Sequence, residues 1–141
     1  MKLTTKGRYA VMAMADLAAY QNGKPVSLVD ISLRQNISLS YLEQLFSKLK
    51  NEQLVKSVRG SSGGYVLEKN PKDIKLSNII FAVDEEVRTL NCKRDSKRGC
   101  NGKTMKCITH NLWEDLEQHI NNFFENVSLS DLLKQKQIDI N

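Results

Sequence analysis

Apolar residues near the start of the chain recur at three- and four-residue steps, which is the spacing of an amphipathic helix. The apolar positions of this segment are Tyr9, Ala10, Ala13, Met14, Leu17 and Ala18. They predict a helix over residues 5–20, and the turn at Asn22-Gly23 ends the pattern. Ser27 is a good N-cap with Asp30 three residues after it, and predicts a short second helix over residues 28–35.

A tight turn over residues 35–37 separates this helix from a third, which the pattern carries to about Asn51. Ser38 and Ser40 are both suitable N-caps for the third helix, and the sequence leaves the choice between them open. Its apolar stripe consists of Leu42, Leu45, Phe46 and Leu49, and its polar face of Ser40, Tyr41, Glu43, Gln44, Ser47 and Lys48. Two helices joined by a short turn are the signature of a helix-turn-helix.

Two β-prone runs follow directly, over residues 54–59 and 65–67, with a glycine-rich turn over residues 60–64 between them. This order predicts a β-hairpin. A helix-turn-helix followed at once by a hairpin describes a winged helix. The expected fold class is therefore mainly α with a small β-hairpin wing.

The second half of the chain carries one strong pattern and one gap. Ser77 can cap a short helix over residues 78–83, whereas residues 91–107 show no periodicity. A long helix is then predicted over residues 111–134. Its apolar stripe consists of Leu112, Trp113, Leu116, Ile120, Phe123, Phe124 and Val127. We expect this stripe to pair with its copy in a homodimer, although it could also cover the core of its own chain.

The net positive charge of the chain comes from its N-terminal half. Residues 1–70 hold 10 Lys and Arg against 5 Asp and Glu, a net of +5, and residues 71–141 hold 11 against 11, a net of zero. A polyanionic partner such as DNA would suit the half that holds the predicted helix-turn-helix. The longest apolar run, residues 9–15, is far shorter than the roughly 20 residues that span a bilayer, so we expect a cytoplasmic protein with no membrane partner.

The third helix and the wing supply the candidate contacts to double-stranded DNA. In the major groove Gln44 can pair with adenine, and Glu43 can accept from cytosine N4 or else cap its own helix with Ser40. Arg59 on the wing suits a narrow minor groove. The lysines that can neutralise phosphates are Lys48, Lys50 and Lys56. The predicted DNA-binding residues are Ser38, Ser40, Tyr41, Glu43, Gln44, Lys48, Ser57, Arg59, Gly60 and Ser61.

Three cysteines and a histidine form a candidate metal site with the spacing C-x7-C-x6-C-x2-H, and they are Cys92, Cys100, Cys107 and His110. Six basic residues lie between the first and the last cysteine, and such a field favours the thiolates that bind metal. Soft thiolate ligands suit both zinc and iron–sulfur clusters, so the spacing alone leaves these two open, beside the alternative of three unliganded thiols. His119 has no cysteine neighbour and is expected to lie on the surface or in the dimer seam.

The residues exclude some function classes. No nucleophile–base pair, glycine-rich phosphate loop or paired carboxylate set indicates an enzyme. An iron–sulfur carrier would leave the helix-turn-helix and the wing unexplained. A zinc-stabilised or thiol-oxidation-sensing DNA binder remains the alternative to a cluster-sensing regulator.

Several long segments resemble, in order, the IscR-type iron–sulfur cluster regulators. They are MKLTTKGRYAVMAM, ISLSYLEQLFSKLKNEQLVKSVRG, GGYVL and the cysteine cluster leading into THNLWEDL. The resemblance covers about residues 1–133 and implies a dimeric winged-helix transcription factor that binds a 2Fe–2S cluster and controls iron–sulfur assembly genes. It implies that the three cysteines and His110 ligate the cluster, that Ser40, Glu43 and Gln44 read the major groove, and that Arg59 reads the minor groove.

The chain departs from this family at two places. The cysteine loop is longer by two residues in its first gap and by one in its second, and the wing carries RGSSGGY in place of RGPGGGY. The expected organisation is a winged helix-turn-helix DNA-binding domain over 1–75, a short helix and cluster-binding loop over 76–110, a dimerisation helix over 111–134 and a flexible tail over 135–141. DNA, a second copy of the chain and the iron–sulfur assembly machinery are the expected partners.

Overall fold

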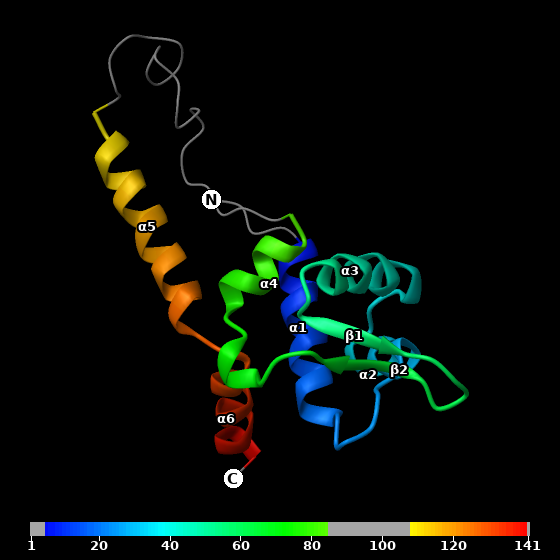
Figure 1. Ribbon diagram of the computed structural model, residues 1–141. Helices are drawn as coiled ribbons and strands as arrows, with labels where there is room; N and C mark the ends of the chain where they lie inside the picture. The colour runs from blue at the N-terminus through cyan, green and yellow to red at the C-terminus, as the bar shows by residue number, and fades with distance from the viewer. Residues whose placement is uncertain (1–4, 85–107, 141) are drawn as a thin grey trace.

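The structure is a computed structural model that describes residues 5–84 and 108–140, with side chains as far as residue 134. Its elements follow one another as α1 (Thr5–Tyr20), α2 (Leu28–Gln35), α3 (Leu39–Asn51), β1 (Val55–Val58), β2 (Gly64–Leu67), the 3-10 turn η1 (Pro71–Asp73), α4 (Leu76–Ala82), α5 (His110–Asn126) and α6 (Leu129–Ile140) (Figure 1). The mainly helical fold with one antiparallel hairpin is the predicted class. No helix in the described part of the chain is long and apolar enough to cross a membrane.

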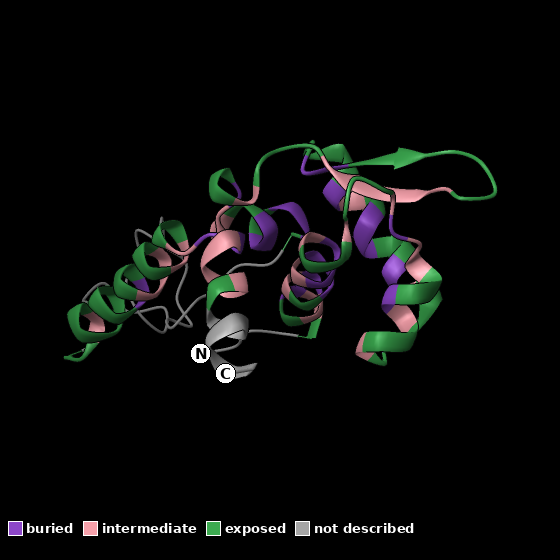
Figure 2. Cartoon of the chain, turned by 90° about the horizontal axis from the view of Figure 1, so that it is seen from below, coloured by how far each residue is buried: buried purple, intermediate pink, exposed green. Residues whose placement is uncertain are grey.

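Helix α1 is the centre of the core. Its buried side chains include Ala10, Ala13, Met14 and Leu17, each fully inaccessible to solvent. Alanines on this face let neighbouring helices approach closely, and α1 contacts α2, α3, α4, α6 and β2. The buried positions gather where these elements meet (Figure 2). The core around α1 therefore also includes residues that follow the predicted DNA-binding domain of residues 1–75, Leu129 among them.

The helix-turn-helix has well-defined caps. Ser27 Oγ accepts a hydrogen bond from Asp30 N at 3.1 Å and begins α2. Asn36 ends α2 in the left-handed conformation, with φ 55° and ψ 49°, which asparagine tolerates better than most residues. Ser38 is the N-cap of α3, because its Oγ accepts from Tyr41 N at 3.2 Å. This resolves the choice between Ser38 and Ser40 that the sequence left open.

The wing is the predicted hairpin with an additional bridge. β1 and β2 are antiparallel, with Val55 opposite Leu67 and Val58 opposite Gly64. On its other side β2 exchanges two backbone hydrogen bonds with the segment before α2, Val26 N to Tyr65 O at 2.9 Å and Tyr65 N to Val26 O at 2.8 Å. This bridge fixes the wing to the start of the helix-turn-helix.

Helix α4 begins earlier than predicted. The sequence placed it over residues 78–83 with Ser77 as the cap, but the helix spans Leu76–Ala82 and Ser77 lies inside it. The reason is that Asn78 Oδ1 accepts from Lys75 N at 2.8 Å and satisfies a backbone donor at the helix start.

The predicted single helix over residues 111–134 is wrong, since the structure divides it into α5 and α6 at Val127-Ser128. Ser128 and Asp131 form a reciprocal capping box, with Ser128 N donating to Asp131 Oδ2 at 2.9 Å and Asp131 N donating to Ser128 Oγ at 3.2 Å. Leu76 N donates to Val127 O at 2.9 Å and Leu129 N donates to Ile74 O at 3.0 Å, and these two hydrogen bonds attach the break to the chain at the start of α4. The helix also continues to Ile140, within the segment 135–141 that the sequence assigned to a flexible tail.

The two C-terminal helices are placed differently. α6 packs against α1 and η1, and Leu129 at its start is fully buried. α5 contacts α4 and otherwise projects from the domain (Figure 1). α6 therefore covers the core of its own chain over much of its described length, whereas α5 contributes Phe124 near its C-terminal end.

Candidate DNA-binding surface and cluster ligands

Helix α3 has one buried and one open face, as predicted. Its buried residues are Leu42, Leu45, Phe46 and Leu49. Ser40, Glu43 and Gln44 are exposed, whereas Tyr41 is half-buried. Ser40 Oγ lies 3.0 Å from Ser38 Oγ. Within the described part of the chain, no hydrogen bond or ion pair engages the Glu43 carboxylate, so its predicted capping alternative with Ser40 is not formed.

An open hollow of about 430 Å³ adjoins the N-terminal end of α3. Its lining combines the start of α1 with the turn and first residues of α3, and consists of Thr5, Tyr9, Asn36, Ile37, Ser38, Ser40, Tyr41 and Gln44. Tyr9 and Tyr41 meet edge to face, with ring centroids 5.9 Å apart and an interplanar angle of 84°. This contact joins α1 to α3 beside the hollow. Sequence reasoning identified Tyr9 only as a core position.

The predicted phosphate-binding lysines do not share one environment. Lys48 Nζ lies 3.0 Å from Asp84 Oδ2 and forms an ion pair. Lys50 Nζ donates to Ser57 Oγ at 3.0 Å, which joins the end of α3 to β1. Lys56 is exposed on β1. The structure therefore brings Lys50 and Ser57 together and gives Lys48 an acidic partner that the sequence did not indicate.

The tip of the wing is open to solvent. Arg59, Gly60 and Ser61 are exposed, and Gly63 N donates to Gly60 O at 3.0 Å to close the turn. Gly60 has φ 124°, a conformation that suits glycine. The hairpin extends away from the helices (Figure 1), and Arg59 directly follows the last residue of β1.

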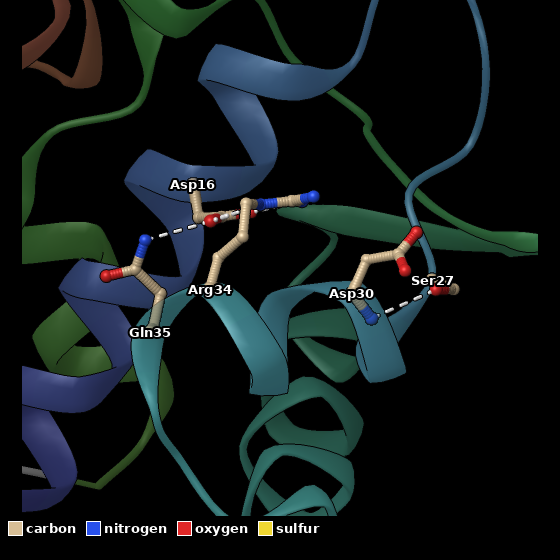
Figure 3. A network of polar contacts seen from close by, with 5 residues as sticks. All are labelled: Asp16, Ser27, Asp30, Arg34 and Gln35. Atoms are coloured by element: carbon tan, nitrogen blue, oxygen red, sulfur yellow. Dashed lines mark hydrogen bonds and ion pairs between the residues drawn. The ribbon is translucent and has the colours of Figure 1, made fainter.

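A buried carboxylate that sequence reasoning missed positions the helix-turn-helix. Asp16 of α1 is 3% exposed and accepts from Arg34 Nε at 2.9 Å, from the second guanidinium nitrogen at 2.8 Å and from Gln35 Nε2 at 2.9 Å (Figure 3). The hydrogen bond to Asp16 raises the pKa of Arg34. The guanidinium also lies 4.0 Å from the ring centroid of Tyr20. The available signal was an acidic residue on the otherwise apolar face of the first helix.

Of the four candidate metal ligands, the structure describes only the histidine. Cys92, Cys100 and Cys107 lie outside the described residues, and His110 begins α5. The side chain of His110 is 14% exposed, and its Nε2 lies 3.8 Å from Glu114 Oε2. His119 is exposed on the same helix, as predicted. Three thiols with one imidazole are a donor set that fits an iron–sulfur cluster or zinc.

Comparison with known proteins agrees with this architecture. The relatives include the HTH-type transcriptional regulator IscR of Photorhabdus laumondii, 49% identical over 138 residues that cover 98% of this chain and 82% of that protein. The IscR of Yersinia pseudotuberculosis is 50% identical over the same shares. They are named as transcriptional regulators, which confirms the prediction that the chain is not an enzyme.

Solved structures with the same fold include CymR, the global cysteine regulator of B. subtilis, with a TM-score of 0.79 and 32% identity over 96% of this chain and 98% of that one. The IscR of T. potens has a TM-score of 0.76 and 38% identity over 96% and 88% of the two chains. These neighbours confirm the winged-helix fold class. A family model described as Rrf2, iron-dependent transcriptional regulator, matches residues 3–135. The chain belongs to the Rrf2 family of transcriptional regulators.

Proposed function

We propose that a homodimer of this chain binds a double-stranded DNA operator in the cytoplasm and regulates iron–sulfur assembly genes according to the state of a 2Fe–2S cluster that it holds. One observation carries the DNA-binding part. The polar face of α3 is exposed directly beside a protruding wing, while the apolar face of the same helix fills the core. A recognition helix that enters the major groove requires this division.

The exposed face offers two chemically distinct base contacts. The Gln44 amide can pair with adenine through N6 and N7, and the Glu43 carboxylate can only accept, which selects cytosine N4. Arg59 at the wing supplies a cation for a narrow minor groove. The remaining residues proposed to contact DNA are Ser38, Ser40, Tyr41, Lys48, Ser57, Gly60 and Ser61. Asp16 holds α2 against α1 and so positions the turn from which α3 starts.

The apolar stripe of α5 supports the homodimer. Its exposed members are Leu112, Trp113, Leu116 and Phe123, of which Phe123 is 61% exposed. Phe124 of the stripe packs against the core of the same chain, whereas these four exposed side chains lie on the projecting part of α5 and remain for a second copy. A two-fold dimer would present two α3 helices to a palindromic operator.

The cluster part rests on the donor set. Cys92, Cys100, Cys107 and His110 would hold the group, and a 2Fe–2S cluster would supply a redox- and iron-sensitive link between these four residues. Because His110 is the first residue of α5, a ligand at this position couples the site to the proposed dimerisation helix. The iron–sulfur assembly machinery would be the partner that delivers the cluster. Zinc on the same residues is the second candidate, since thiolate and imidazole ligands are common to both.

The decisive experiment is anaerobic purification of the wild type and two histidine variants, with visible spectra and iron, sulfide and zinc counts. A red-brown wild-type protein with equal iron and sulfide supports the proposal if its visible spectrum is lost or shifted in His110→Ala and unchanged in His119→Ala. A colourless protein with one zinc favours the second candidate. A chain that stays metal-free after cluster reconstitution contradicts both. DNA binding is tested separately, by the loss of operator binding in Gln44→Ala with folding intact.

A further inference from the structure

Lys48 lies where a phosphate contact is expected, but its charge is already matched. It follows Gln44 by four residues and Ser40 by eight, so the three share one face of α3. Its ammonium is 3.0 Å from the carboxylate of Asp84, with the side chains 39% and 75% exposed. The partner is the second residue after α4, and α3 and α4 are in contact.

The backbone of Asp84 contributes to this arrangement. Asp84 adopts the left-handed conformation, with φ 59°, and its N–H donates to Phe81 O at 3.0 Å. This turn closes the C-terminal end of α4. The carboxylate of Asp84 then lies within ion-pair distance of Lys48, near the end of α3. The ion pair is exposed, so its contribution to folding stability is small. Its effect on the affinity for a polyanion is larger, because each lysine that contacts a DNA phosphate releases counterions.

We infer that Asp84 attenuates DNA binding by neutralising Lys48, so that the recognition helix contacts DNA with one effective cation fewer than its sequence carries. Lys50 provides the contrast, since its partner is the neutral Ser57 hydroxyl and its charge remains available. This inference rests on the DNA-binding function proposed above. It assigns to Asp84, shortly after α4, a role in setting the affinity for DNA that the residues of α3 alone do not indicate.

The test measures binding of a fluorescein-labelled DNA duplex of about 30 base pairs, three helical turns, across a series of salt concentrations. Asp84→Asn keeps a residue that tolerates the left-handed conformation. It is expected to tighten binding severalfold at low salt and to steepen the slope of log K against log salt by up to about 0.9, the value of one phosphate contact. Glu52→Gln removes an equal charge beside α3 and is the matched control, with a smaller expected gain.

A double-mutant cycle assigns the effect to the pair. In a Lys48→Gln background, Asp84→Asn should leave the slope unchanged and should raise the affinity no more than Glu52→Gln does. The inference is overturned by an unchanged slope in Asp84→Asn, by an equal gain in Glu52→Gln, or by a gain that persists in full without Lys48. Wild type that binds no duplex, despite a folded circular dichroism spectrum, would instead remove the proposed DNA-binding function, and this inference with it.

Discussion

Asp16 and Arg34, 18 positions apart, form a bidentate ion pair with N–O distances of 2.9 and 2.8 Å, and it fastens α2 to α1. Asp16 is buried, whereas the Arg34 side chain is 30% exposed and retains water on part of its surface. A planar guanidinium matches both carboxylate oxygens at once, and a lysine does not. The pair therefore fixes the angle between two helices as well as their separation.

Replacement of Asp16 by Asn is expected to lower the free energy of unfolding by about 1–3 kcal/mol, because it removes two charge-assisted hydrogen bonds and disturbs a third, from Gln35. Arg34→Lys should lose part of the same stability while it keeps the charge. Urea denaturation followed by circular dichroism measures both, with Asp73→Asn as an exposed control. Wild-type stability in Asp16→Asn would show that the pair does not organise the helix-turn-helix.

The close approach of Gly64 to Val26 gives a second prediction. A Cβ at position 64 would lie 2.2 Å from Val26 O and 2.8 Å from Ser27 N, which are backbone atoms with little freedom to move. Gly64→Ala should therefore break the bridge between wing and helix-turn-helix and reduce stability by about 1–3 kcal/mol. Ser62→Ala, at the exposed tip, is the control and should change little. Equal thermal melting of the two variants would contradict the account of the wing.

The local signals of the sequence were sufficient for the N-terminal fold. Cap residues, the glycine-rich turn and the two periodicities predicted α1, α2, α3 and the hairpin, because each signal acts within a few residues. The division between α5 and α6 was missed because Val127 continues the apolar stripe of α5. Ser128 and Asp131 form a capping box, which indicates the start of a new helix. Helical periodicity alone does not detect it, because the apolar stripe runs up to Val127.

Long-range partners could not be predicted in this way. Asp16 binds Arg34 and Lys48 binds Asp84 only because the fold brings α1 to α2 and α4 to α3, and nothing in the spacing of these residues indicates it. The candidate DNA-binding surface likewise has features that local sequence predicts and features that depend on tertiary contacts. Exposure on α3 followed from helical periodicity, whereas the environment of each lysine depended on tertiary structure. The cysteine ligand set remains a prediction, since its three thiols lie outside the described residues.

The Ser128–Asp131 capping box makes stability depend on pH. The backbone N–H of Ser128, and then its hydroxyl, hold the pKa of Asp131 below the ordinary value of 3.8. A lowered folded-state pKa contributes stability that is present above 3.8 and is lost as the pH falls through the lower folded value. Asp131→Asn should therefore be less stable than wild type at about pH 7, and the gap should shrink at about pH 3. Denaturation at both pH values tests this, with Asp115→Asn as the control, and a constant gap would contradict it.

The exposed carboxylate of Glu43 gives the prediction closest to function. An acid on a DNA-facing helix repels phosphates everywhere and gains only where it accepts from a cytosine N4. Glu43→Ala should consequently bind a wider range of DNA sequences, with discrimination at one base pair reduced by roughly 1–3 kcal/mol. Selection from a randomised duplex library, carried out on wild type, Glu43→Ala and the charge-matched control Glu52→Gln, measures the change. An unaltered set of selected sequences in Glu43→Ala would mean that this carboxylate does not face the bases, and the docking of α3 would have to be rotated toward Gln44 and Lys48.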